Sequence, residues 1–297
     1  MLDPRRMQVL REVAGRGSFS AAARSLHLTQ PAVSRAVAKL EREAGTRLLE
    51  RTSRGILLTE AGELVVARAA AIAGHLTAVD RDLEAIRGLR AGSVRVGAFP
   101  HAGASLVVPA AAALTQRHPG VEVVFRDVAS AEGLRLVAAG ELDVAVVFRD
   151  RRVPAPADGL VRTHLRDDPM LVALPVSHRL ASRRSVALED LRDERWIHGT
   201  QHAVSGLILR ACRDAGFEPR IVAQTDHAAI SHGLVAAEVG VTLVPGLALP
   251  TLRPDVVARP VRGGGPVRTV EAVALDERPR PPATEALLEA LVRAGRG

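Results

Sequence analysis

The chain has 297 residues, a formal net charge of +7 and a hydrophobic content of 47%. This length allows more than one domain, each with a core of its own. No apolar run reaches membrane-spanning length and the N-terminus lacks the apolar core of a signal peptide, so we expect a soluble cytoplasmic protein. A single cysteine excludes an internal disulfide framework, and the lack of Tyr argues against single-strand recognition by base stacking.

Positive charge is concentrated in the N-terminal part of the chain. Residues 1–60 contain eleven Arg or Lys against six Asp or Glu, a net +5 of the total +7. A DNA-binding head needs such charge to displace counterions from phosphates. The first element expected there is a helix over residues 4–16, with Met7, Leu10 and Ala14 on one side.

Two more helices follow, joined by a tight connection at residues 27–28. The first is short and rich in alanine, so another helix can approach it closely. The second has Thr29 as its cap and Pro31 in its first turn, where a missing N–H is tolerated. Its core side carries Val33, Val37 and Leu40, and its other side carries Gln30, Ser34, Arg35, Lys39 and Arg42.

This pattern predicts a helix-turn-helix whose second helix enters the DNA major groove. Arg35 can pair with guanine, Gln30 with adenine, and Ser34 can reach a base or a phosphate. Two short apolar strands, 48–49 and 56–58, then flank an Arg-rich tip and predict a wing. Arg51 or Arg54 of this wing can contact phosphates or a minor groove; the alternative is a solvated hairpin tip.

A long helix is expected from Glu60 to Arg90, about 45 Å in length. Its apolar positions alternate by four and three residues: Val65, Ala69, Ile72, Leu76, Val79, Leu83 and Ile86. Such a heptad seam predicts that two helices wrap together, so the target DNA should be roughly palindromic. The alternative is packing on the protein's own body. Gly74 weakens the helix, and residues 88–92 look like a hinge.

From residue 94 to residue 147, strands and helices alternate, which predicts a parallel sheet with helices on both faces, and a second set of elements follows. The expected strands are 94–97, 121–125, 142–147, 170–174, 196–197, 221–223, 241–244 and 267–274. The expected helices are 103–117, 130–139, 203–215, 227–238 and 283–294.

Residues 3–63 resemble the N-terminal domain of LysR-type transcriptional regulators. The resemblance rests on Phe19-Ser20-Ala21-Ala22-Ala23, Leu28-Thr29-Gln30-Pro31-Ala32-Val33-Ser34, Leu40-Glu41, Arg47-Leu48-Leu49-Glu50-Arg51-Thr52 and Leu58-Thr59-Glu60-Ala61-Gly62. The residues expected to contact DNA are Ser18, Thr29, Gln30, Pro31, Ser34, Arg35, Lys39, Arg51 and Arg54.

Residues 93–297 resemble the effector domain of the same bacterial family, through segments 140–146 and 234–245. The resemblance implies an α/β protein with an N-terminal all-α winged helix-turn-helix (1–59), a dimerising linker helix (60–90) and a two-lobed, periplasmic-binding-protein-like effector domain (93–297). Lobe I is expected at 93–164 and 268–297 and lobe II at 165–267, with crossings near 162–166 and 263–268. A homodimer or homotetramer that binds promoter DNA and contacts RNA polymerase is also implied.

Ligands of parallel α/β lobes bind beyond the carboxyl ends of strands. Aligned with the family, the effector-contacting residues are His101, Ser130, Thr200, Gln201 and His202, with Thr225 and Pro245 added. These donors suit a small polar or carboxylate effector. The alternative is that Ser130 and Thr200 only cap helices.

Other functions have less support in the residues. The pairs His198/His202 and His227/His232 have poor metal-ligand spacing, so we expect no metal or cofactor. Cys212 is either a redox sensor or, more ordinarily, a buried thiol. A solute-binding protein or an enzyme on the same two-lobed fold is the alternative function, but no nucleophile–base set is evident. An architectural DNA binder with a degenerate cleft is a third possibility.

Overall fold

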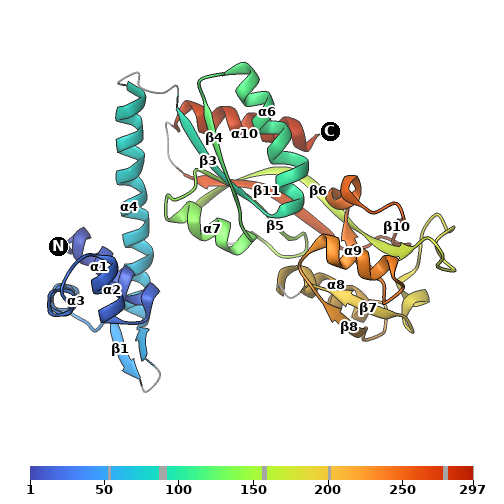
Figure 1. Cartoon of the computed structure of the whole chain (residues 1–297), viewed down its shortest axis with the longest axis horizontal. Helices are drawn as coiled ribbons and strands as arrows, with labels where there is room; N and C mark the ends of the chain where they lie inside the picture. The colour runs from blue at the N-terminus through green and yellow to red at the C-terminus, as the bar shows by residue number, and fades with distance from the viewer. Residues whose placement is uncertain (53–54, 87–91, 156–158, 200–201, 277–279, 297) are drawn as a thin grey trace.

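The computed structural model describes residues 1–52, 55–86, 92–155, 159–199, 202–276 and 280–296. The chain forms a head at its N-terminus, a long helix α4 (Glu60–Ile86) and a two-lobed α/β part, arranged in that order (Figure 1). Among the described helices, none combines the length and the apolar character needed to cross a membrane.

The head has the predicted winged helix-turn-helix order. Its elements are α1 (Pro4–Arg16), α2 (Phe19–Ser25), α3 (Gln30–Ala44), β1 (Leu49–Thr52) and β2 (Gly55–Leu58). Its core joins the inner faces of the three helices to the start of α4 and consists of Met7, Leu10, Val13, Ala22, Ala23, Val33, Val37, Leu40, Leu48, Val65 and Ala69. The first two positions of the expected dimer seam, Val65 and Ala69, are thus buried within the chain's own head.

Lobe I is built on a sheet whose first strands are joined by helices. Its elements are β3 (Ser93–Ala98), α5 (Pro100–Ala102), a π-helical turn (Gly103–Val107), α6 (Val108–Arg117), β4 (Glu122–Asp127), α7 (Ser130–Ala138) and β5 (Val144–Asp150). β3 lies between β4 and β5 and is parallel to both, as the alternating pattern predicts.

Strand β6 (Leu160–Pro175) connects the two lobes in one continuous run. Up to Pro169 it pairs antiparallel with β11 (Val267–Leu275), and from Met170 it pairs antiparallel with β9 (Thr242–Pro245) and β10 (Val256–Pro260). β11 is also antiparallel to β5. The antiparallel strands β6, β9, β10 and β11 lie outside the segment 94–147, for which the alternating pattern predicted a parallel sheet.

Lobe II covers its part of the sheet with helices and a small second sheet. Its further elements are a 3₁₀ turn (Leu188–Leu191), β7 (Arg195–His198), α8 (His202–Asp214), β8 (Arg220–Gln224), α9 (Ala228–Ala236) and a second 3₁₀ turn (Gly246–Thr251). β7 and β8 pair in parallel. Strand β10 was not predicted.

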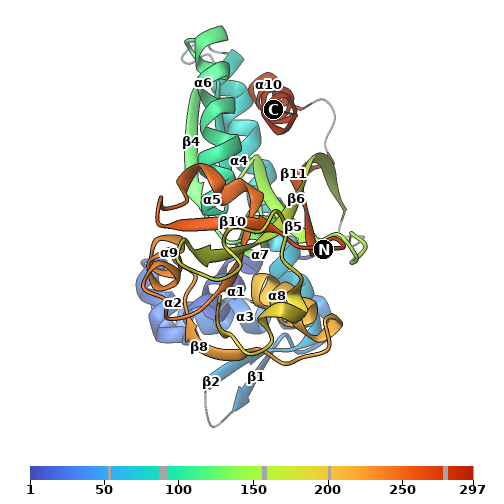
Figure 2. The same cartoon turned by 90° about the vertical axis from the view of Figure 1, so that its right-hand side faces the viewer.

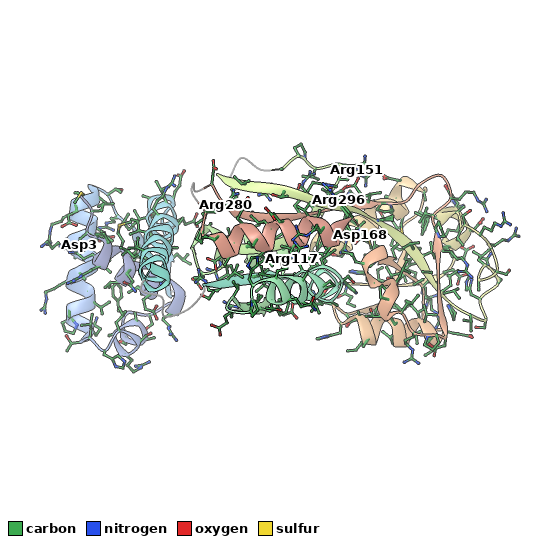
Figure 3. The ribbon with its side chains drawn as sticks, turned by 90° about the horizontal axis from the view of Figure 1, so that it is seen from above. Asp3, Arg117, Arg151, Asp168, Arg280 and Arg296 are labelled. Carbon is green, nitrogen blue, oxygen red and sulfur yellow. The ribbon has the colours of Figure 1, made fainter. Side chains whose placement is uncertain are left out.

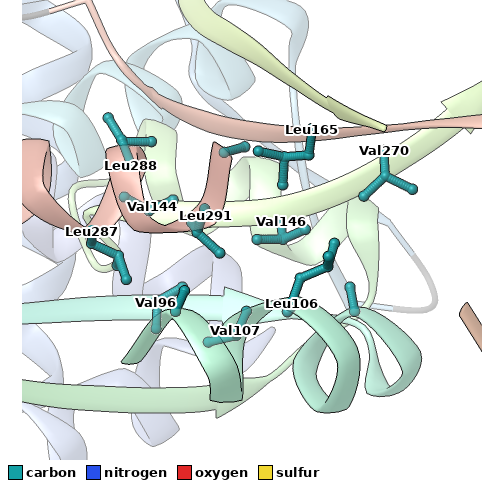
Figure 4. Packing of buried hydrophobic residues seen from close by; sticks show 14 of the residues in the cluster. Val96, Leu106, Val107, Val144, Val146, Leu165, Val270, Leu287, Leu288 and Leu291 are labelled. Atoms are coloured by element: carbon teal, nitrogen blue, oxygen red, sulfur yellow. The ribbon is translucent and has the colours of Figure 1, made fainter. Parts of the chain in front are cut away.

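The core of lobe I lies between the sheet and helices α6 and α10 (Pro282–Gly295), where Val96, Leu106, Val146, Leu287 and Leu291 pack together (Figure 4). Helix α7 covers the opposite face with Leu136 and Val137. The two views of the ribbon show α6 and α10 on one side of the sheet (Figures 1 and 2). β11 and α10 therefore return the chain to lobe I.

Candidate DNA-binding head and effector site

Helix α3 separates its buried side from its polar side. Val33, Val37 and Leu40 are buried in the head core. The opposite side exposes Gln30, Pro31, Arg35 and Lys39, and leaves Ser34 half-buried. Among the described residues, neither Arg35 nor Lys39 has an ion-pair partner, in contrast to Arg16, which pairs with Glu12 at 2.9 Å. The free donors of α3 are therefore available to a ligand outside the head.

Side chains cap the N-termini of both helices of the helix-turn-helix, α2 and α3. The Ser18 hydroxyl accepts a hydrogen bond from the backbone N–H of Ala21, and the Thr29 hydroxyl accepts one from that of Ala32, each at 3.4 Å. Between the helices His27 has a φ of +54°, in the left-handed region, which closes the turn. Gly45 ends α3 at a φ of +70°.

The wing is attached to helix α3 by Glu41, a residue for which the sequence pattern predicted no role. The Glu41 carboxylate accepts the backbone N–H groups of Leu48 and Leu49 at 2.9 and 3.3 Å. A cavity of about 430 Å³ lies between α3 and the wing, and Ser34 and Arg47 are among its lining residues. Arg47, absent from the expected DNA-contacting set, therefore lines the same cavity as Ser34.

The wing strands pair antiparallel from Leu49 opposite Leu58 to Thr52 opposite Gly55. The backbone of Arg51 belongs to β1, opposite Ile56. The prediction for Arg54 falls outside the described residues. Contact of either arginine with DNA stays a prediction.

A buried ion pair lies at the junction between the lobes. Arg268 of β11 donates from Nε (3.2 Å) and Nη2 (2.5 Å) to Oδ2 of Asp168 on β6, and the exposed fractions are 2% and 0%. The other carboxylate oxygen accepts the backbone N–H of Leu247 at 3.0 Å. The guanidinium also lies over the rings of Phe99 and Phe148, at 5.1 and 4.5 Å. Figure 3 places Asp168 where the two lobes meet.

His101 lies next to this pair, at the start of the helix that follows β3. Burial, followed by the charges of Arg268 and His232, lowers the pKa of His101 to about 4, against an opposing effect of Asp168. His232 of α9 is itself buried, and burial lowers its pKa as well. Charged or titratable residues from lobe II and both connecting strands thus act on one imidazole of lobe I, which is neutral near pH 7.

Ser130 joins the same neighbourhood through Phe148. Its hydroxyl accepts the backbone N–H of Phe148 at 3.1 Å, while Ala129 is the N-cap of α7. The alternative that Ser130 acts as a helix cap is therefore wrong. The connection to β5 arises because Ser130 starts the helix that packs over that strand.

The remaining expected effector residues are in lobe II. The Thr225 hydroxyl accepts the backbone N–H of His227 at 3.2 Å, and the Thr225 N–H donates to the carbonyl of His198 at 2.9 Å. Pro245 ends β9 opposite Met170. Thr200 and Gln201 fall outside the described residues, and His202 begins α8.

Cys212 and the paired histidines were considered above as a redox sensor and as metal ligands. Cys212 is buried in the core of lobe II, and burial raises the pKa of its thiol to about 12. His198 contacts the carbonyl of Gly199 and the side chain of Gln224. Within the described part of the chain, no group of three or more His, Cys, Asp or Glu could hold a metal ion.

Arg268, Asp168, Phe99 and Phe148 were missed by sequence reasoning. Arg268 and Asp168 are one hundred positions apart and meet only because β11 and β6 pair in that register. Spacing along the chain carries no signal for such a contact. One indication was available in the sequence for Phe99 and His101: both directly follow an apolar strand, and ligands of α/β lobes bind beyond such strand ends.

Comparison with known proteins agrees with this arrangement. The family model described as the bacterial regulatory helix-turn-helix protein, lysR family, matches residues 4–63, and the model of the LysR substrate binding domain matches residues 87–296. The chain is 29% identical over 262 residues to the HTH-type transcriptional regulator AlsR of Bacillus subtilis, covering 87% of this chain and 85% of AlsR. It is 29% identical to the DNA-binding transcriptional dual regulator OxyR of Escherichia coli over 293 residues, which is 98% of this chain and 95% of OxyR.

Solved structures share the fold at full length. A full-length OxyR variant from Pseudomonas aeruginosa superposes with a TM-score of 0.69 at 23% identity, covering 98% of this chain and 95% of that one. Full-length CbnR in complex with its target DNA superposes with a TM-score of 0.65 at 22% identity, covering 99% and 100%. Since both family models match in order along the chain, the protein belongs to the LysR family of DNA-binding transcriptional regulators with an effector-binding domain.

Proposed function

We propose that this chain binds promoter DNA sequence-specifically by inserting α3 into the major groove. Gln30, Ser34 and Arg35 contact base edges, since an exposed guanidinium and amide match the acceptors and donors of guanine and adenine. The observation that carries the proposal is the outer face of α3, where Arg35 and Lys39 are exposed and have no ion-pair partner among the described residues.

Phosphate contacts hold the head on the duplex in this proposal. Ser18, Thr29 and Pro31 lie at helix N-termini, whose N–H groups favour anions. Lys39, Arg51 and Arg54 supply positive charge. These contacts position α3 and set most of the salt dependence, without reading sequence.

A second copy of the chain pairs with α4. Leu76 and Val79 are 60% and 54% exposed, although they continue the apolar stripe that begins at Val65. Leu83 and Ile86 are the next two positions of the same heptad pattern. Two paired heads would read half-sites about one helical turn apart. Assembly of dimers into a tetramer, contact with RNA polymerase and a cytoplasmic location belong to the proposal as well.

A small polar or carboxylate effector binds at the lobe junction in this proposal. His101, Ser130 and Thr225 follow strands of the two lobes and Pro245 ends one, and Thr200, Gln201 and His202 complete the proposed set. The effector acts only if it binds two arrangements of the lobes with unequal affinity. The protein regulates without catalysing a reaction.

Binding to promoter fragments tests this function. Fragments recovered by genome-wide mapping of the bound DNA are compared with scrambled duplexes of equal length, at one stated salt concentration, because affinity falls steeply with salt. We expect at least about thousandfold tighter binding to the recovered fragments. Equal affinity for both would contradict sequence-specific regulation and would favour an architectural DNA binder.

A further inference from the structure

The linker helix touches lobe I of its own chain at a position where two backbones meet. A Cβ atom added at Gly74 of α4 would lie 2.5 Å from Cα of Gly140 and 2.8 Å from the carbonyl carbon of Ala139. A Cβ atom added at Gly140 would lie 2.9 Å from the carbonyl carbon of Gly74. Real Cβ atoms do not come so close to backbone, so only glycine at both positions allows this approach.

Gly74 lies on the face of α4 that the expected dimer seam leaves free. A helix turns by about 100° per residue, so Gly74 is opposite Ile72 and Leu76. Ala67 and Ala70 share its side and add small residues to the same face. The helix can therefore pack on a partner helix and on lobe I at the same time.

The turn that receives Gly74 is fixed to the sheet of lobe I. Arg95 of β3 donates from its backbone N–H to the Asp143 carboxylate at 2.7 Å and from Nη2 to the carbonyl of Gly140 at 2.5 Å. Gly140 has a φ of +65°, and its N–H donates to the carbonyl of Val137 to close α7. A displacement of lobe I must therefore carry this turn with it.

Strand β3 connects this turn to the lobe junction. It runs from Ser93 to Ala98 and continues directly into Phe99 and His101, which contact or face Arg268. Helix α4 stands beside α7 in Figure 1, and the two helices are in contact. A continuous set of packed groups thus joins the junction of the lobes to the helix that carries the head.

We propose that the contact between Gly74 and the turn at Ala139–Gly140 is an intramolecular docking site that fixes lobe I to the linker helix and so sets the position of the DNA-binding head. Its role in regulation rests on the proposed function, whereas the docking itself does not. Loss of the contact frees the head from lobe I while both remain folded.

The test uses Gly74→Ala and Gly140→Asn in the full-length chain. Alanine is the better helix former, so the first substitution strengthens α4 while separating it from the turn. Asparagine tolerates the left-handed φ of Gly140, so the second adds bulk without losing the turn. Gly15→Ala in α1 is the matched control, because a Cβ atom there meets nothing within 4 Å.

The readout is the distance between spin labels on the exposed residues Gln8 of the head and Gln116 of lobe I. Both are replaced by cysteine, and the labelled chain is diluted into unlabelled chain so that only distances within one chain are measured. Cys212 is buried and stays unlabelled. We expect one narrow distance distribution for the doubly labelled parent and for Gly15→Ala, and a displaced or broadened distribution for Gly74→Ala and Gly140→Asn.

Distributions that coincide in all four proteins would overturn the proposal. Circular dichroism verifies that the variants are folded, and a difference shown by only one of the two variants would also count against a shared contact. The measurement needs no DNA. Failure of promoter recognition together with the expected displacement would therefore reject the proposed function and retain the docking site.

Discussion

At the residue scale, the chemistry of the lobe junction depends on what surrounds each group. His101 is an ordinary imidazole in sequence, but burial beside Arg268 lowers its pKa from 6.5 to about 4. The folded chain therefore keeps His101 neutral where the unfolded chain takes up a proton. Its contribution to stability is complete above pH 6.5 and is lost as the pH falls through about 4.

The reactivity of Cys212 is also set by its surroundings. The pKa of its thiol is raised to about 12 by burial, so almost no thiolate exists near pH 8. We expect iodoacetamide to leave the folded chain unmodified at pH 8 and to modify it once urea unfolds it. We also expect Cys212→Ala to bind promoter DNA like the parent, with or without hydrogen peroxide.

Rapid modification of the folded chain would contradict this placement of Cys212. A peroxide-dependent change in DNA binding that disappears in Cys212→Ala would have the same consequence.

At the element scale, the head could be predicted because its determinants are local. Thr29 caps α3, Gly45 ends it, and Val33, Val37 and Leu40 repeat at helical spacing. Each of these features acts within a few residues, so the sequence pattern and the structure agree closely. Glu41 is different: its bonds to Leu48 and Leu49 depend on how the chain returns after the helix.

The connecting strands could not be predicted to the same extent. β6 runs through sixteen residues and changes partners between Pro169 and Met170, beyond the expected crossing at 162–166. Short apolar runs indicate that a strand exists, but the partner and direction are set by distant segments. The buried Arg268–Asp168 pair depends on that pairing, so it was missed for the same reason.

The apolar stripe of helix α4 is buried in the head at its N-terminal end and exposed farther along the helix. Val65 and Ala69 pack in the head, whereas Leu76 is 60% exposed in the single chain. We expect Leu76→Glu to dissociate the assembly in sedimentation analysis, because two carboxylates would face one another across the seam. Loss of assembly should also weaken promoter binding, since the two heads then bind independently.

Leu64→Glu is the matched control for this change. Leu64 is also 60% exposed and lies on α4, but outside the heptad positions. It should sediment like the parent. An unchanged assembly in Leu76→Glu, or equal dissociation in both variants, would show that the seam is not the interface.

At the scale of the whole molecule, one helix connects a head with exposed basic residues to a pair of lobes with a buried, charged junction. The stripe of α4 packs in the head at Val65 and Ala69 and is exposed at Leu76, and its opposite side touches lobe I through Gly74. In the sequence alone Gly74 indicates only a weaker helix. In the structure Gly74 permits a close contact with the backbone of Ala139 and Gly140 that any larger residue would exclude. In our proposal this contact couples the position of lobe I to that of the head.

The central claim is that α3 reads bases, and Arg35→Ala tests it most directly. Affinities of the parent and the variant are measured for a promoter fragment and for a scrambled duplex at the same salt concentration, with Lys39→Ala as a comparison for a phosphate contact. A bidentate contact with guanine predicts that Arg35→Ala loses about ten- to hundredfold in specific affinity. Binding of Arg35→Ala to scrambled DNA should be nearly unchanged, whereas Lys39→Ala should weaken binding to both duplexes by similar factors. Equal losses on both duplexes for Arg35→Ala would contradict base reading by this helix.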